Sequence, residues 1–189
     1  STSKLSREHA VAHTVPGLVV VAGGKYTTYR VMAQDAIDAA VYALDKKVPP
    51  SVTADVPLLG AEGYAALRNS RNVLAQTYGL HVARIDHLLG RYGSLIHEVL
   101  ALVADDPSLA EPVTGAPDYL RAELVYAASH EGARHLDDLL ARRTRISIET
   151  FDRGLGAVEE AAELVAPVLG WSRAQIDREV EHYRKRVEA

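Results

Sequence analysis

The first 47 residues combine short apolar segments with one amphipathic segment. Residues 9–13 and 17–22 are apolar and β-branched and flank Pro16-Gly17, which predicts a hairpin or two strands near a sheet edge. From Thr27 to about Asp45 the polar residues fall near one stripe, which predicts a helix buried over most of its girth. Two strands and such a helix cannot form their own core, so we expect them to belong to a larger domain.

The chain after residue 57 has the period of helices. Pro49-Pro50 marks residues 48–57 as a linker, because paired prolines cannot continue a helix. The pattern predicts a compact helical domain over residues 58–189. The helices are expected to end near Gly79, Gly90 and Asp105, to cover about 118–130, 135–142 and 155–166, and to start again at Ser172. Pro167 is expected to kink or stop the helix before it.

The fold class is therefore mainly α, with a strand-strand-helix segment over residues 1–47 as the remnant of an α/β or α+β domain. Composition adds exclusions. A formal charge of -4 gives no broad basic face for nucleic acid, and the absence of cysteine excludes disulfides and thiolate metal sites. No apolar run approaches the roughly 18 residues of a membrane span, so we expect a soluble or peripheral chain.

The stretch VVVAGGKYTTYR, residues 19–30, predicts a strand, a tight turn and a helix N-terminus. We call residues 23–28 the glycine corner. Thr27 and Thr28 can cap the helix, while free amides and Lys25 direct positive potential to one point, which favours an anion or cofactor site. The alternative is that Gly23-Gly24 only permits a tight turn. A P-loop is excluded, because Val19 stands where that motif needs glycine.

Three other motifs give weaker indications of a functional site. Gly154-Leu155-Gly156 lacks the preceding strand of a dinucleotide-binding turn, and His130 and His135 are five residues apart rather than the four of a zinc-protease helix, so we expect no metal site. A basic cluster is expected to form a salt-bridged helix face or a domain contact, with an anion site as the alternative. It comprises Arg134, Arg142, Arg143 and Arg145.

Three motifs in order resemble the C-terminal third of the FAD-dependent glycerol-3-phosphate dehydrogenases. They are LSREHAV, PGLVVVAGGKYTTYRVMAQDAID and EGARHLDDLLARRTRISIE. The likeness covers nearly the whole chain, and the family typically has leucine where this chain has Tyr26. It implies a flavoenzyme that oxidises sn-glycerol 3-phosphate to dihydroxyacetone phosphate and passes electrons through FAD to a quinone.

The resemblance also implies roles for single residues. Lys25 lies beside the flavin and the substrate as a catalytic residue, and Arg7 binds the substrate phosphate. The residues facing the pyrimidine edge of the flavin are Gly23, Gly24, Lys25, Tyr26, Thr27 and Thr28. An ammonium and helix amides there stabilise the charge that hydride transfer leaves on the ring.

The dinucleotide-binding turn and its acidic ribose partner are not in this sequence, so we expect this chain to be the C-terminal part of a longer enzyme, without FAD or activity by itself. Its expected partners are the missing N-terminal FAD domain, glycerol 3-phosphate and a quinone. We expect a cytoplasmic protein. A homodimer and peripheral contact with the inner face of the cell membrane are further possibilities. The alternative function is a non-catalytic helical interaction or oligomerisation module.

Overall fold

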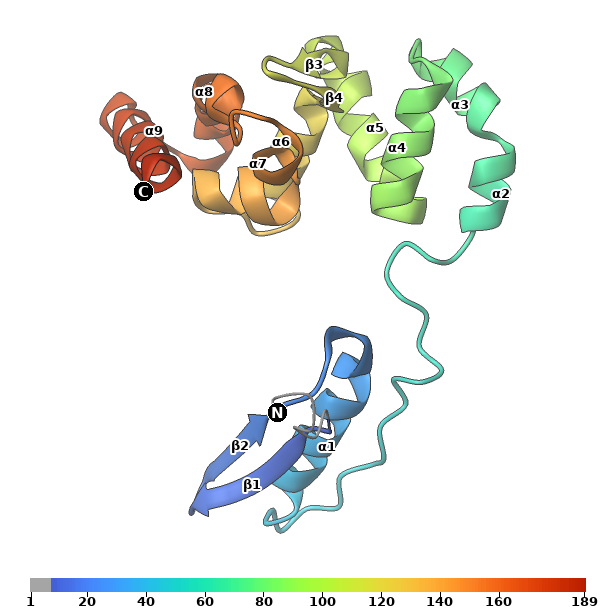
Figure 1. Ribbon diagram of the computed structural model, residues 1–189. Coiled ribbons are helices and arrows are strands. Elements are labelled where there is room, and N and C mark those ends of the chain that lie inside the picture. Colours follow the sequence, from blue (N-terminus) through green and yellow to red (C-terminus); the bar gives the residue numbers. More distant parts are fainter. Residues whose placement is uncertain (1–7) are drawn as a thin grey trace, which may run out of the picture. The chain divides into compact units, whose positions relative to one another are not determined.

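The computed structural model describes residues 8–189, and the chain forms two compact units that divide between Pro57 and Leu58. We call the part up to Pro57 the hairpin unit and Leu58–Ala189 the helical unit; both are drawn in Figure 1. The architecture is mainly α, as the sequence predicts, with short strands in each unit.

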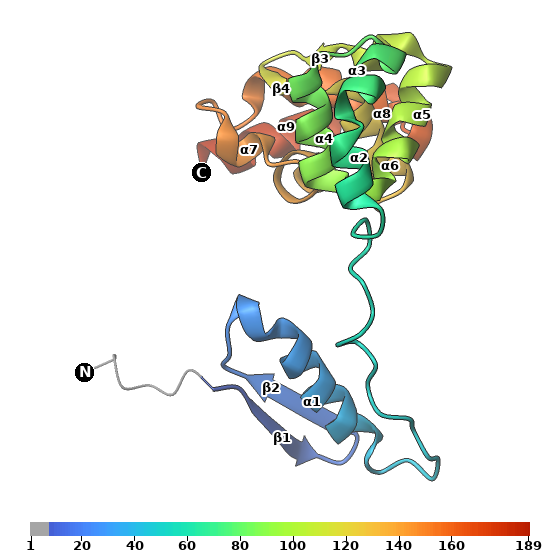
Figure 2. The ribbon, with the colours of Figure 1, turned by 90° about the vertical axis from the view of Figure 1, so that its right-hand side faces the viewer.

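The hairpin unit consists of an antiparallel hairpin covered by one helix. Strands β1 (Ala10–Val15) and β2 (Leu18–Ala22) pair from Ala10 opposite Ala22, and Gly17 in the turn has φ +82°. A short 3-10 turn, η2 (Tyr26–Thr28), leads into α1 (Tyr29–Val41), which lies along one face of the hairpin in Figure 2.

None of the residues from 8 to 57 is buried. Ile37 on α1 is 59% exposed and Val15 on β1 is 56% exposed. A single helix on a two-stranded hairpin covers only part of each element. Most of the apolar surface of α1 is therefore not covered within this chain, although its sequence predicts a helix buried over most of its girth.

The helical unit is built from short helices and one small hairpin. Its first elements are α2 (Tyr64–Asn69), α3 (Arg71–Tyr78), α4 (Val82–Tyr92), η3 (Gly93–Leu95), α5 (Ile96–Asp105) and η4 (Pro107–Ala110). Its later elements are β3 (Pro112–Val113), β4 (Ala116–Leu120), α6 (Arg121–Ser129), the π-helical turn η5 (Asp138–Arg143), α7 (Ile146–Glu149), η6 (Leu155–Ala157), α8 (Val158–Leu169) and α9 (Arg173–Glu188).

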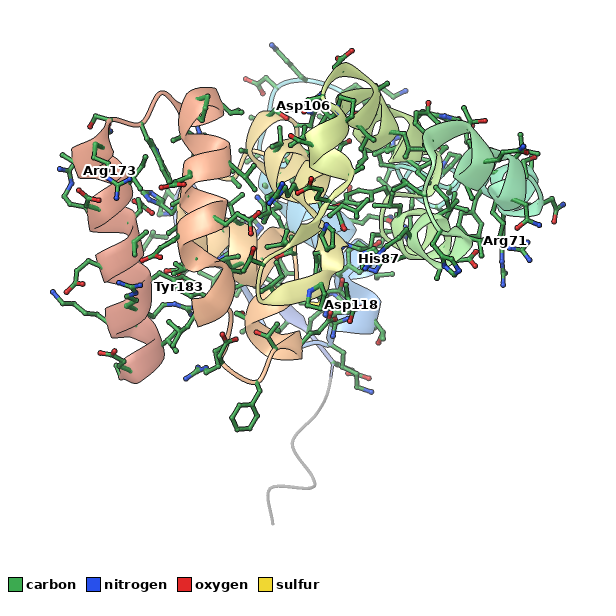
Figure 3. The ribbon with its side chains drawn as sticks, turned by 90° about the horizontal axis from the view of Figure 1, so that it is seen from above. Arg71, His87, Asp106, Asp118, Arg173 and Tyr183 are labelled. Carbon is green, nitrogen blue, oxygen red and sulfur yellow. The ribbon has the colours of Figure 1, made fainter. Side chains whose placement is uncertain are left out.

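Helix α6 separates two apolar clusters of this unit. Ala122 and Tyr126 pack with side chains of α4 and α5, and Leu124 and Ala127 pack with side chains of η5, α8 and α9. Tyr183 of α9, labelled in Figure 3, is fully buried and donates a hydrogen bond to the carbonyl of Arg153 at 2.7 Å. Because α6 is apolar on opposite sides, it holds the two clusters together as one unit.

The structure departs from the sequence pattern at several helix ends. Gly90 lies inside α4, which ends at Tyr92 with its C-cap at Gly93 (φ +57°), so the prediction of a C-cap at Gly90 is wrong. Pro167 lies inside α8 and does not stop it. The proline lacks one backbone N–H, but the helix continues past it to its C-cap at Gly170. The helix expected from Asp118 begins only at α6, since β4 occupies the residues before it.

The helix expected over residues 135–142 is also different, because its regular part is a π-helical turn. Thr144 is fully buried, and both its N–H and its hydroxyl donate hydrogen bonds to the carbonyl of Leu139, at 2.9 Å and 2.6 Å. These i to i+5 bonds widen the turn, which hydrophobic periodicity alone does not reveal.

Candidate functional site

The glycine corner has the strand-turn-helix geometry that its sequence predicts, and both glycines have a left-handed backbone. Gly23 has φ +83° and Gly24 has φ +89°. A Cβ on Gly23 would lie 2.7 Å from the carbonyl oxygen of Glu8, and one on Gly24 would collide with Sδ of Met32. Both positions therefore favour glycine for backbone conformation, and Gly23 also for space, because the atom that its Cβ would meet is backbone.

Thr28 closes the first turn of the corner. Its Oγ1 accepts a hydrogen bond from the Lys25 N–H at 3.2 Å and donates one to the Lys25 carbonyl at 3.0 Å. The prediction that Thr27 and Thr28 cap the helix is not met at α1: Thr28 is its N-cap residue but makes no side-chain capping hydrogen bond to it. The hydroxyl of Thr27 makes no hydrogen bond to any described residue. Of the two threonines, Thr28 therefore fixes the turn.

Two backbone donors and one ammonium remain available at the corner. The N–H groups of Tyr26 and Thr27, at the start of η2, make no hydrogen bond to the part of the chain between residues 8 and 189, as is usual for the first amides of a helix. The Lys25 side chain is exposed and forms no ion pair with any described carboxylate. Together they give the corner a positive potential that could hold an anionic or dipolar group.

The remaining predicted site residues are less constrained. Tyr26 is 90% exposed, and its ring centroid lies 6.0 Å from that of Tyr29. Arg7, the predicted phosphate ligand, lies outside the described residues. The roles assigned to Arg7, Lys25 and the corner amides stay predictions.

A histidine that the sequence analysis did not single out lies beside the corner. Nε2 of His9 is 2.6 Å from Oδ2 of Asp35 on α1. A Cβ on Gly24 would be 3.4 Å from Cβ of His9, so this pair adjoins the turn. His9 falls within the motif LSREHAV and Asp35 within PGLVVVAGGKYTTYRVMAQDAID. Conservation of the two positions among relatives would have been the signal, and a single sequence does not show conservation.

The basic cluster of the helical unit is partly neutralised. Arg142 pairs with Asp138 at 2.9 Å, and Arg145 pairs with Glu149 at 3.3 Å. Arg143 instead donates a hydrogen bond from Nε to the carbonyl of Glu131 at 2.8 Å. Arg142 and Arg145 are thus salt-bridged as expected, whereas Arg134 and Arg143 form no ion pair with a described carboxylate.

The helical unit also has an open pocket of about 450 Å³ with mixed charge. It is lined by His81, Ala83, Arg84, His87, Asp118 and Glu149; His87 and Asp118 are labelled in Figure 3. In the part of the chain that the structure describes, no group of three or more acidic and histidine side chains has the arrangement of a metal site. No helix between residues 8 and 189 has both the length and the apolar content needed to cross a membrane.

Comparisons with known proteins identify relatives of both units. Residues 51–176 match the family described as the C-terminal domain of alpha-glycerophosphate oxidase. The whole chain is 62% identical to glycerol-3-phosphate dehydrogenase 2 of Mycobacterium tuberculosis over 188 residues, which is 32% of that protein. It is 34% identical to the mitochondrial glycerol-3-phosphate dehydrogenase of Bos taurus, with 97% of this chain and 25% of that protein covered.

A solved structure has the same fold over most of the chain. The glycerol-3-phosphate dehydrogenase from Bacillus halodurans, in complex with FAD, superposes with a TM-score of 0.76 at 22% identity, covering 95% of this chain and 37% of that one. The chain thus spans about a third of the length of the mycobacterial relative.

Proposed function

This chain belongs to the family of the C-terminal domain of alpha-glycerophosphate oxidase, and from that premise we propose that it is the C-terminal part of an FAD-dependent glycerol-3-phosphate dehydrogenase. The full-length protein oxidises sn-glycerol 3-phosphate to dihydroxyacetone phosphate and passes the electrons to a quinone. The observation that carries this proposal is the 62% identity, along the whole of this chain, to glycerol-3-phosphate dehydrogenase 2 of Mycobacterium tuberculosis.

The glycine corner has features that fit a flavin. The left-handed backbone of Gly23 and Gly24 forms the tight turn that precedes η2, and the free amides of Tyr26 and Thr27 supply donors to a ring. FAD, when bound, supplies an acceptor for the hydride that leaves the substrate carbon. The residues of this chain would stabilise the negative charge that the hydride leaves on the ring.

Lys25 and the two amides act electrostatically. An ammonium and a helix N-terminus that are oriented before the reaction stabilise negative charge without reorganising, and each contributes on the order of 1 to a few kcal/mol in a dry site. The bonds between Thr28 and the backbone of Lys25 keep the turn closed, so the donors stay in place. Lys25 is in this sense the catalytic residue of the chain.

Substrate binding is assigned to Arg7. A guanidinium binds phosphate through two parallel hydrogen bonds, which fixes both the position and the orientation of the ligand. The partners of this chain are then the N-terminal FAD domain, glycerol 3-phosphate and the quinone. We place the protein in the cytoplasm, with peripheral contact at the inner face of the membrane where the quinone is reached.

The experiment that tests this proposal compares two forms of the protein. The 189-residue chain is expected to be purified without flavin absorbance, whereas the protein with its N-terminal region restored is expected to bind FAD and to reduce a dye when glycerol 3-phosphate is added. A restored protein that binds FAD but leaves the dye oxidised would overturn the proposal. Glycerol without phosphate serves as the control substrate.

A further inference from the structure

The contact between His9 and Asp35 joins segments that are 26 residues apart in the sequence. His9 immediately precedes β1, and Asp35 lies in the middle of α1. The side chain of His9 is 19% exposed and that of Asp35 is 45% exposed, so the contact is partly shielded from water. A hydrogen bond of 2.6 Å to a carboxylate is among the stronger kinds in proteins.

The same segments pack directly against the Gly23-Gly24 turn. A Cβ on Gly23 would lie 3.6 Å from Cα of His9, and the space beside Gly24 is filled by Met32. Met32 and Asp35 are three residues apart on α1 and therefore share one face of that helix. The pair thus holds the chain before β1 and the face of α1 together at the place where the turn passes between them.

Within this chain, apolar packing does little to fix the corner. None of the residues between 8 and 57 is buried, and the turn itself is held by a single threonine, Thr28. Within this chain, the hydrogen bond between His9 and Asp35 joins the segment before β1 directly to α1 beside the corner.

We propose that His9 and Asp35 form a positioning pair for the glycine corner, and that their hydrogen bond sets the place of Lys25 and of the Tyr26 and Thr27 amides relative to the flavin. The inference rests on the proposed function. Neither residue is assigned contact with the substrate. Their effect passes through the position of the turn.

Two variants of the full-length protein separate positioning from simple electrostatics. Asp35→Ala removes a negative charge near the corner, whereas His9→Ala removes a group that is either neutral or positive. If the two side chains acted only through their charge, the two variants would not both lower the midpoint potential of the flavin. Loss of the Asp35 carboxylate would raise that potential, because a nearby negative charge disfavours the reduced flavin. A positioning pair lowers the potential in both variants, because each loosens the same turn.

The expected effects are equal and not additive. Each variant is expected to slow flavin reduction by glycerol 3-phosphate about tenfold. It should also lower the midpoint potential by about 30 mV, the two-electron equivalent of a tenfold change. The double variant should match either single one, since the interaction is already lost. His9→Gln places an amide near the position of Nε2 and should restore the rate to within about twofold of wild type.

Asp38→Ala is the matched control, because Asp38 is an exposed carboxylate on the same helix without a partner among the described residues. The inference is overturned if the single variants keep the wild-type potential and reduction rate, even with a lower melting temperature. It is also overturned if their effects multiply in the double variant, or if Asp38→Ala has the same effect. A wild-type protein that binds FAD but is not reduced by the substrate would end the proposed function and the inference with it, whereas a normal wild-type reaction with unaffected variants ends only the inference.

Discussion

Glu123 of α6 has no exposed surface, and its Oε2 lies 3.1 Å from Nε2 of His87 on α4. The same oxygen accepts a hydrogen bond from the Tyr92 hydroxyl at 3.2 Å and lies 3.3 Å from Nε of Arg91. Its other oxygen accepts the N–H of Leu120 at 2.9 Å. One buried carboxylate of α6 thus joins that helix to α4 and also binds the residue that precedes α6.

Removing this carboxylate is expected to destabilise the helical unit strongly. Glu123→Ala leaves the Arg91 charge and the Leu120 N–H without their partner, so the free energy of unfolding should fall by about 3 to 5 kcal/mol. Urea denaturation measures it. Glu163→Ala is the control, because its pair with Arg173 is exposed and worth about 0 to 1 kcal/mol. Equal losses in the two variants would contradict this account of the core.

The acid stability of the unit is expected to depend on Asp152. Hydrogen bonds from the N–H groups of Gly156, at 2.6 Å, and Gly154, at 3.0 Å, hold the pKa of its carboxyl below the ordinary value against a smaller opposing effect of burial. Because the folded pKa is lower than the unfolded one, this stabilisation is present above about pH 3.9 and is lost as the pH falls through the folded value.

Asp152→Asn should therefore flatten the rise in unfolding free energy that accompanies an increase in pH through the acid range, which denaturation at a series of pH values measures. Asp118→Asn is the comparison, since that carboxylate makes no hydrogen bond to residues in the described chain. If Asp152→Asn kept the full wild-type pH dependence, the two glycine N–H groups would not be the source of the lowered pKa.

Much of the fold follows from apolar periodicity, because long amphipathic segments with clear caps leave few alternatives. Ser172 and Gln175 show this at α9, where the Ser172 N–H donates to Oε1 of Gln175 at 2.8 Å as their spacing predicts. The sequence did not reveal β4 or the π-helical turn. Both depend on pairing with other residues, such as the bond from Thr144 to Leu139, that local pattern does not encode.

Gly24→Ala is expected to impair the corner more than an equivalent change elsewhere in the hairpin unit. A Cβ there is strained by φ +89° and collides with Met32. In the full-length protein we expect flavin reduction to slow at least about tenfold, since small misplacements of catalytic groups are costly. Gly17→Ala is the control, with φ +82° and open space around its Cβ. Equal rates in the two variants would mean that the turn does not position the catalytic groups.

The site could be predicted only in part. The turn was indicated by a glycine pair that is followed by Lys25 and two threonines. The left-handed backbone of both glycines agrees with that pattern. The bonds of Thr28 to the backbone of Lys25 and the pairing of His9 with Asp35 could not be predicted, because both depend on side-chain directions after α1 has packed on the hairpin. Arg7 rests on the motif alone.

Arg7→Ala is expected to weaken substrate binding in the full-length enzyme. Losing charged hydrogen bonds to phosphate should raise KM for glycerol 3-phosphate about 10- to 100-fold, with a smaller effect on kcat. Steady-state kinetics measures both. Lys46→Ala removes an exposed cation from the same unit and should leave KM within about twofold. An unchanged KM in Arg7→Ala would rule out the phosphate contact.

The central claim is that Lys25 stabilises charge that appears on the flavin during the reaction, and stopped-flow measurement of flavin reduction tests it most directly. In the full-length protein with saturating glycerol 3-phosphate, Lys25→Ala should slow reduction about 10- to 100-fold, because each 1.36 kcal/mol lost is worth about a factor of ten. The free energy of unfolding should change little, since Lys25 is exposed and forms no ion pair with a described residue. Lys47→Ala is the control, and its flavin should be reduced by the substrate at the wild-type rate. A wild-type rate in Lys25→Ala would contradict the account.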